Sequence, residues 1–181
     1  MLPRKLENLP SPWPLFLKEV DQALSAPAEL HCLGGFVLAS LYGMPRPTDD
    51  LDYISIVPCG SFNEIEDLGG RGSKLCKKYK VFLQHAGGVV DLPESHEERL
   101  TPLDLGLQKL SLKVIEPYDL ALSKLTRNNP KDREDIKFLA AKLQLSFKTL
   151  MERFDAEMKP WLPNLERHLA TLKLWQGYFS A

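Results

Sequence analysis

The chain has 181 residues, with 23 lysines and arginines against 24 aspartates and glutamates, and a formal net charge of −1. This balance excludes a global basic field for nucleic acid, and no apolar run approaches the roughly 20 residues that a membrane span requires. The hydrophobic fraction of 44% suits one globular domain, with or without a small appendage. The three cysteines lack metal-ligand spacing, and the N-terminal residues lack an apolar signal core, so we expect a cytoplasmic protein.

The first part of the chain alternates predicted helices and strands. Apolar spacing predicts a helix over residues 14–25, a buried strand over 28–33 and a second helix over 36–42. Residues 51–57 alternate and are rich in β-branched side chains, which predicts a strand. This order is typical of an α/β core.

The pattern continues with a glycine-interrupted segment. Residues 61–80 are predicted to be helical at both ends, with glycines between the helical parts. Residues 81–85 and 89–92 are predicted strands around a glycine turn, and residues 107–115 are a weaker strand candidate. We therefore expect the α/β core to extend over residues 1–116.

After Pro117 the pattern is helical. Helices are predicted over residues 118–126, 131–143, 147–158 and 165–178, with breaks at asparagine and proline. The junction is short, so a helical region at 117–181 is expected to pack on the core.

Two acids open the strand at residues 51–57. Asp50 and Asp52 are two residues apart, so their carboxylates should project side by side, whereas Asp49 should face the other way. Such a pair either helps to hold Mg²⁺ together with substrate phosphates, or forms an acidic strand end that accepts hydrogen bonds from a turn.

Asp91 is a third acid in an apolar setting. It follows Val89 and Val90 in a predicted strand, where an unpaired buried carboxylate would be costly. Placed beside Asp50 and Asp52, it would complete the carboxylate set of a two-metal site. The alternative is that Asp91 is a turn acid before a proline.

A glycine pair precedes these acids. Gly34 and Gly35 lie between a predicted strand and a predicted helix, where backbone N–H groups can approach a phosphate. The complete order is strand, glycine pair, helix, and then the motif formed by Arg46, Thr48, Asp50 and Asp52. From the residues alone, Arg46 either grips phosphate or pairs with Asp49, and Thr48 caps the loop with an accessory role.

With this order of motifs, residues 28–92 resemble the DNA polymerase β-like nucleotidyltransferase superfamily. The resemblance implies an α+β fold with a small mixed sheet, and a metal-dependent enzyme that uses a nucleoside triphosphate. It also implies that Gly34 and Gly35 contact the triphosphate. Asp50, Asp52 and Asp91 would ligate Mg²⁺, with Asp91 acting on the attacking hydroxyl.

Residues 119–139 add a second resemblance, to the Lys-x-x-Arg…Lys-Asp-x-x-Asp segment of AbiEii-type toxins and related nucleotidyltransferases. It implies that Lys124 meets the nucleotide phosphates and that Arg127 and Asp132 lie near the site. From the residues alone, Asp132 is equally consistent with a first-turn helix acid, Asp135 is interpreted as a structural first-turn acid, and Lys124 is also consistent with a solvated position.

These features predict transfer of a nucleoside monophosphate to a hydroxyl acceptor with release of pyrophosphate. The toxin-like resemblance implies a tRNA end or a protein side chain as acceptor, and a cognate antitoxin as partner. Two alternatives stay open: a catalytically silent binding module that acts through a protein partner, and modification of a small molecule. A basic run from Lys74 to Lys80 is either a solvated helix face or a contact for RNA phosphates.

Overall fold

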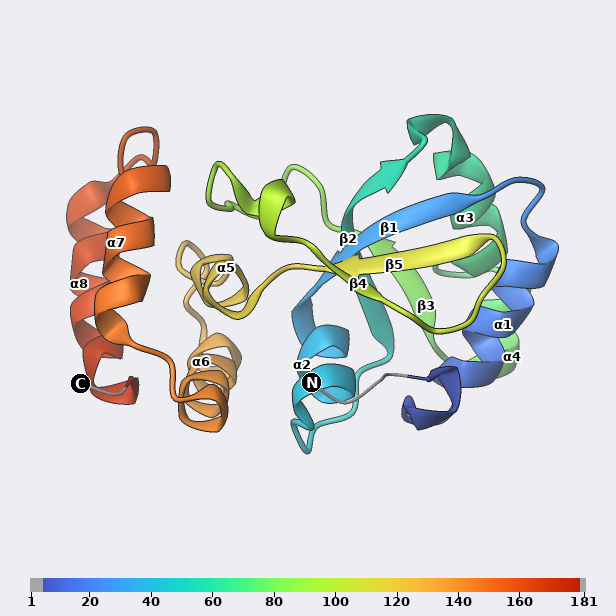
Figure 1. Cartoon of the computed structure of the whole chain (residues 1–181), viewed down its shortest axis with the longest axis horizontal. Coiled ribbons are helices and arrows are strands. Elements are labelled where there is room, and N and C mark those ends of the chain that lie inside the picture. Colours follow the sequence, from blue (N-terminus) through green and yellow to red (C-terminus); the bar gives the residue numbers. More distant parts are fainter. Residues whose placement is uncertain (1–4, 180–181) are drawn as a thin grey trace. The chain divides into compact units, whose positions relative to one another are not determined.

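The computed structural model describes residues 5–179 and has the α+β architecture that the sequence predicts, with one mixed five-stranded sheet (Figure 1). The strands are β1 (Ala28–Leu33), β2 (Asp50–Val57), β3 (Phe82–His85), β4 (Thr101–Leu103) and β5 (Leu110–Val114). The helices are α1 (Trp13–Ala23), α2 (Gly34–Tyr42), α3 (Phe62–Gly69), α4 (Lys74–Tyr79), α5 (Pro117–Leu122), α6 (Pro130–Leu143), α7 (Phe147–Glu157) and α8 (Leu165–Trp175).

The chain forms two compact units, which we describe separately. Unit 1 extends to Gly87 and resumes over Leu100–Val114, so it contains the whole sheet and α1 to α4. Unit 2 consists of Gly88–Arg99 and the chain from Ile115 onward, with α5 to α8. Residues 88–99, which the sequence analysis grouped with the core, therefore belong to unit 2.

The sheet of unit 1 has the strand order β3-β2-β1-β5-β4. β1 is antiparallel to β2 and parallel to β5, β3 is parallel to β2, and β4 is antiparallel to β5. The antiparallel β1–β2 pair brings the end of β1 next to the start of β2, because Leu33 pairs with Asp52. The helix α2, which begins directly after β1, therefore starts beside the two predicted acids.

One face of this sheet carries the core of unit 1. Leu51 and Tyr53 on β2 are fully buried, and Figure 1 shows α1, α3 and α4 together on one side of the sheet. A methyl group added at Gly69 would lie 2.7 Å from the side chain of Leu83, so α3 packs closely on β3. Side chains alternate along β2, so Asp50 and Asp52, which are partly exposed, project to the opposite face.

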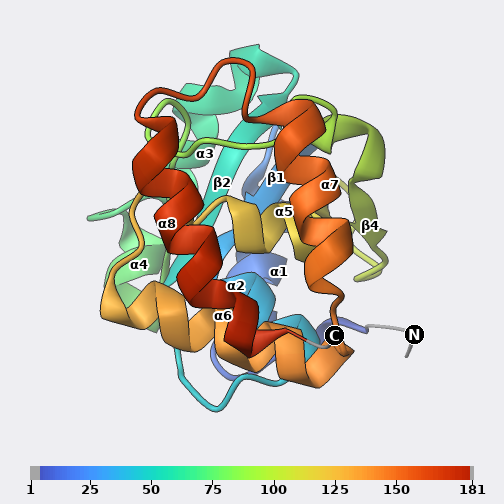
Figure 2. The same cartoon turned by 90° about the vertical axis from the view of Figure 1, so that its left-hand side faces the viewer.

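Unit 2 contains the four C-terminal helices (Figure 2) and the segment of residues 88–99. Ion pairs fix this segment: the Arg99 guanidinium lies 2.9 Å from the buried carboxylate of Asp119 and 2.7 Å from that of Glu157. Glu157 also accepts the backbone N–H of Ser95 at 3.0 Å. Arg153 pairs with Asp119 from the other side at 3.0 Å.

The strand predicted over residues 89–92 is wrong. These residues form no strand; they follow a turn in which Gly88 has a φ of +80°, and the Val89 side chain is 82% exposed. A run of four residues with three apolar side chains is too short to show whether a neighbouring strand exists to pair with it. The sequence analysis also missed β4, a three-residue strand that contains Pro102. No helix among residues 5–179 is both long and apolar enough to cross a membrane.

Candidate active site

Asp52 lies against the first residue of α2. Gly34 has a φ of +76°, and a Cβ atom built on it would overlap Asp52 Oδ2 and lie 3.2 Å from Asp52 Cγ. The Asp52 carboxylate can therefore occupy this position only because residue 34 has no side chain. The start of α2 has no side-chain cap, and a helix N-terminus carries partial positive charge that favours a nearby anion.

Asp50 is held through Thr48. The Thr48 hydroxyl contacts Asp50 Oδ1 in a short hydrogen bond, and it also lies 3.2 Å from the backbone carbonyl oxygen of Asp50. A Cβ atom at Gly35 would meet Thr48 Oγ1 at 3.1 Å. The two glycines are thus matched to two side chains of the acidic motif, Gly34 to Asp52 and Gly35 to Thr48.

An amide stands beside Asp52 on the neighbouring strand. β3 pairs with β2 so that Gln84 is opposite Asp52, and Gln84 Nε2 donates to Asp52 Oδ1 at 3.3 Å. The sequence analysis expected a third carboxylate on the strand next to Asp50 and Asp52. In unit 1 that strand is β3, and it offers an amide donor that orients Asp52.

The surroundings of Asp52 contain no reactive thiol. Burial, and then the negative charge of Asp52, raise the pKa of the Cys32 thiol, so this cysteine stays protonated at neutral pH. Arg46 is partly exposed in the loop between α2 and β2. Both interpretations of Arg46, phosphate binding and a pair with Asp49, remain predictions.

Asp91 is described in unit 2. It is partly exposed, and its Oδ2 accepts a hydrogen bond from the Thr126 hydroxyl at 2.6 Å. Thr126 follows α5, so this bond joins the segment of residues 88–99 to the helical part of the same unit. The role of Asp91 as a third metal ligand remains a prediction.

Lys124 is buried in an ion-pair cluster of unit 2. Its ammonium lies 2.9 Å from Asp135 Oδ2 and 3.5 Å from Asp132 Oδ1, and all three residues are at most 5% exposed. Two carboxylates of the protein therefore neutralise the positive charge of Lys124, which the sequence analysis expected to meet the phosphates of the nucleotide. The cluster ties the chain after α5 to the first turns of α6.

Asp132 is a first-turn acid of α6, and its predicted place near the nucleotide site remains a prediction. It forms a capping box with Asn129 at the start of α6, and it accepts two hydrogen bonds from the Arg127 guanidinium at 2.8 and 2.6 Å. Burial opposes ionisation of this carboxyl. The bonds from Arg127 and the charge of Lys124 outweigh burial and lower the pKa of Asp132.

The two acids of unit 1, Asp50 and Asp52, suit a metal site in which substrate phosphates supply the remaining ligands. Asp50 and Asp52 present carboxylate oxygens on one face of β2, and Mg²⁺ is usually held by one or two carboxylates together with substrate phosphates and water. Among residues 5–179, neither unit contains a group of three or more His, Cys, Asp or Glu side chains that could hold a metal ion by itself. The geometry therefore fits Mg²⁺ that arrives with a phosphate ligand, held by Asp50 and Asp52.

Replacing Gly34 by alanine is expected to displace Asp52. The new Cβ overlaps the carboxylate, and a positive φ strains any residue with a side chain, so the free energy of unfolding should fall by about 1–3 kcal/mol. A displacement of about 1 Å at a catalytic group can cost about 100-fold in rate, so catalytic activity should fall by that order. Chemical denaturation and a turnover assay measure the two effects.

Gly35→Ala is the matched control. Gly35 has no positive φ, and the nearest atom to its added Cβ is the Thr48 hydroxyl oxygen at 3.1 Å. The free energy of unfolding should therefore change by less than about 1 kcal/mol. If both variants behaved alike, the proposed fit between Gly34 and Asp52 would be wrong.

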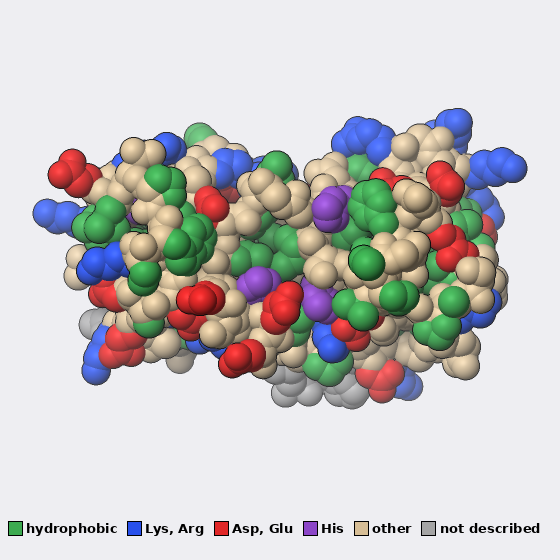
Figure 3. All heavy atoms as spheres, turned by 90° about the horizontal axis from the view of Figure 1, so that it is seen from above, with side chains coloured by type: hydrophobic (Ala, Val, Ile, Leu, Met, Phe, Trp, Pro, Cys, Tyr) green, Lys and Arg blue, Asp and Glu red, His purple; other side chains and the backbone are tan. Residues whose placement is uncertain are grey.

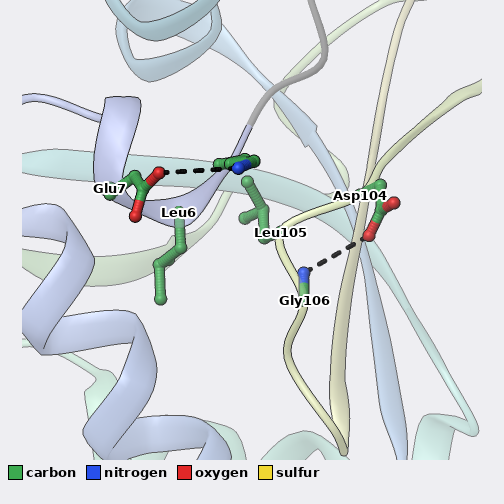
Figure 4. Close-up of a pocket in the computed structure, with 6 residues that line it drawn as sticks. Leu6, Glu7, Asp104, Leu105 and Gly106 are labelled. Atoms are coloured by element: carbon green, nitrogen blue, oxygen red, sulfur yellow. Dashed lines mark hydrogen bonds and ion pairs between the residues drawn. The ribbon is translucent and has the colours of Figure 1, made fainter.

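A pocket elsewhere in unit 1 holds none of the predicted site residues. It lies between the N-terminal turn and the loop after β4 and is lined by Lys5, Leu6, Glu7, Asp104, Leu105 and Gly106 (Figure 4). The Gly106 N–H donates to Asp104 Oδ1 at 3.3 Å, so the loop closes on itself beside the pocket. The pocket does not coincide with Asp50 and Asp52, and we assign it no catalytic role.

Comparison with protein families gives a match over most of the chain. The model of a protein family with the description "Nucleotidyltransferase of unknown function (DUF6036)" matches residues 17–179, which is most of the chain. No curated protein and no solved structure gives a significant match.

Proposed function

Because the chain belongs to the DUF6036 family of nucleotidyltransferases of unknown function, we propose that it moves a nucleoside monophosphate from a nucleoside triphosphate to a hydroxyl acceptor. The observation that carries this proposal is the placement of Asp50 and Asp52 on one face of β2, with Asp52 against the start of α2 at Gly34. A helix start and two carboxylates at one point suit a phosphate chain with its Mg²⁺.

In the proposed reaction the acceptor hydroxyl oxygen forms a bond to the α-phosphorus of the triphosphate. The bond from that phosphorus to the oxygen bridging to the β-phosphorus breaks, and pyrophosphate leaves with the electron pair. The hydroxyl proton passes to a base, for which Asp91 is the residue predicted from the sequence. Mg²⁺ bound by Asp50 and Asp52 would offset the negative charge of the phosphates, which is the main requirement of such transfers.

The chain's own residues position this chemistry. Thr48 holds Asp50, and Gln84 orients Asp52, so neither carboxylate is left to rotate freely before substrate binds. The phosphate-binding role of Lys124, and the nearby roles of Arg127 and Asp132, rest on the sequence resemblance. Likeness to the AbiEii-type branch supports a tRNA end or a protein side chain as acceptor, a cognate antitoxin as partner and a cytoplasmic location.

Gln84 supports one alternative, a catalytically silent module that acts through a protein partner. An amide cannot replace a carboxylate as an anionic metal ligand, and Gln84 occupies the β3 position opposite Asp52. A silent module would retain the fold and a protein partner but transfer no nucleotide.

The test is incubation of the full chain with each α-labelled nucleoside triphosphate, Mg²⁺ and a cell lysate, followed by separation of RNA, protein and small molecules. Label in RNA or protein supports transfer to a macromolecule, and label in the small-molecule fraction supports the aminoglycoside-adenylating type of activity. The transfer proposal would be abandoned if no fraction acquired label with any of the four nucleotides while the protein remained folded. That result would favour the silent module.

A further inference from the structure

Arg71 forms a fixed cation beside the acidic strand of unit 1. It is exposed in the glycine-containing loop between α3 and α4, and the centre of its guanidinium lies 4.2 Å from the centroid of the Phe82 ring. Phe82 itself is only 4% exposed. A guanidinium on an aromatic face is held in place by stacking and cation–π attraction, so its orientation is restricted before any ligand binds.

The sheet register places this cation next to the carboxylates. Phe82 pairs with Asp50 across the parallel β2–β3 ladder, and its N–H donates to the Asp49 carbonyl at 2.9 Å. Paired residues project to the same face of a sheet, and neighbouring strands are about 4.8 Å apart. The Phe82 ring, with Arg71 over it, therefore belongs to the same face as the Asp50 carboxylate.

The loop that carries Arg71 is anchored at this edge of the sheet. Gly70 forms an isolated parallel bridge with Leu83 on β3, one residue before Arg71. A Cβ atom at Gly70 would lie 2.5 Å from the Glu66 carbonyl oxygen, so the backbone passes close to the end of α3. The position of Arg71 thus follows from backbone pairing as well as from the ring contact.

The guanidinium N–H donors of Arg71 have no hydrogen-bond partner within the part of the chain that the structure describes. Among residues 5–179 Arg71 has no carboxylate partner and no hydrogen bond, whereas Arg99 and Arg153 are each held by carboxylates. Exposed lysines follow it on and after α4, at residues 74, 77, 78 and 80. Figure 3 shows exposed Lys and Arg side chains, mixed with Asp and Glu side chains, on the face of the molecule that it draws.

We propose that Arg71, seated on Phe82, binds the phosphate chain of the nucleoside triphosphate whose transfer Asp50 and Asp52 support. A guanidinium offers five N–H donors in a planar fork that matches phosphate oxygens. Arg71 would then supply positive charge from the β3 edge, while Asp50 and Asp52 hold the metal ion. This inference rests on the proposed function and adds to it a substrate-binding residue that the sequence analysis did not single out.

The test measures triphosphate binding to the full chain by titration calorimetry. ATP, CTP, GTP, UTP and inorganic tripolyphosphate are titrated separately, in EDTA and in Mg²⁺, into wild type, Arg71→Leu and Arg71→Lys. Loss of charge-assisted hydrogen bonds is expected to weaken triphosphate binding by about 10- to 100-fold in Arg71→Leu. The triphosphate affinity of Arg71→Lys should lie between those of wild type and Arg71→Leu, because lysine keeps the positive charge but lacks the planar fork of donors.

Lys74→Leu is the matched control. Lys74 is an exposed cation three residues further along, without a ring contact, so its loss should change affinity by less than about 3-fold. Thermal unfolding of each variant verifies that the fold is intact. Equal weakening by Arg71→Leu and Lys74→Leu would show a general charge effect and overturn the inference.

The two proposals fail in different ways. If wild type transfers label and binds triphosphate, but Arg71→Leu binds as tightly as wild type, only the role of Arg71 is wrong. If wild type binds no triphosphate and transfers no label, the proposed function fails and the Arg71 inference fails with it.

Discussion

Asp52→Asn is expected to lower nucleotide transfer by about 10³-fold, because under the proposed function it removes an anionic ligand of Mg²⁺ and leaves the fold in place. The substituted side chain has the same shape, so it still fits against Gly34. Asp50 and Asp52 are two like charges on one strand face, and removing one relieves repulsion, so the melting temperature should stay level or rise. Label transfer, Mg²⁺ titration and thermal unfolding together measure these effects.

Asp49→Asn provides the matched control for Asp52→Asn. It makes the same change of charge one residue before Asp50, at an exposed side chain, and it keeps the backbone carbonyl that accepts the Phe82 N–H. Transfer should change by less than about 3-fold, because an exposed charge is screened by solvent and salt. Equal losses in the two variants would mean that the site responds to net charge and that Asp52 has no special role.

Lys124→Met is expected to lower the free energy of unfolding by about 3–5 kcal/mol, because it leaves Asp132 and Asp135 buried without their shared ammonium. Both carboxylates are at most 2% exposed. Lys131→Met, an exposed lysine in the first turn of α6, is the control and should change stability by less than about 0.5 kcal/mol. Urea denaturation measures both variants.

A second substitution separates an ion-pair effect from a packing effect. Adding Asp135→Asn to Lys124→Met removes one of the two carboxylate charges that Lys124 neutralises, and it should recover about 1–3 kcal/mol, as a double-mutant cycle would report. A loss of less than 1 kcal/mol in Lys124→Met alone would mean that the cluster contributes little to folding.

The pH dependence of stability follows from the lowered pKa of Asp132. A carboxyl with a folded-state pKa below its unfolded value stabilises the protein fully above the unfolded value, near 3.9. That contribution is lost as the pH falls through the lower, folded-state pKa. Wild type should therefore lose stability below about pH 4, and Lys124→Met should lose less over that range because one cause of the lowered pKa is gone.

Much of the α/β core was predictable because its patterns are local. The strand at residues 28–33 agrees with β1, the one at 51–57 begins one residue earlier as β2, and the acids fall at the predicted strand start. Alternation along β2 correctly places Asp50 and Asp52 away from the buried side chains of Leu51 and Tyr53. The predicted contact of the glycine pair with phosphate remains a prediction. The structure shows a separate reason for glycine at these positions: the side chains of Asp52 and Thr48 occupy the space that a Cβ atom would take.

The rest depended on pairing between distant segments, which no local pattern contains. Gln84 is opposite Asp52 only because of the β2–β3 register, and Arg71 reaches Phe82 only because its loop pairs with β3. The burial of Lys124 between two acids likewise depends on how α6 follows α5. The error at residues 89–92 came from treating a short apolar run as evidence of a strand partner.

The chain passes from unit 1 to unit 2 after Gly87, returns at Leu100 and leaves again after Val114. No single cut therefore separates the two units, although a boundary near residue 116 looks natural from the sequence. A fragment ending there would retain Arg99 while losing Asp119 and Glu157, leaving a guanidinium without its two acidic partners. Dissection by truncation is thus a poor route to an isolated unit 1, and a circularly rearranged chain or a paired co-expression of fragments would respect the connectivity better.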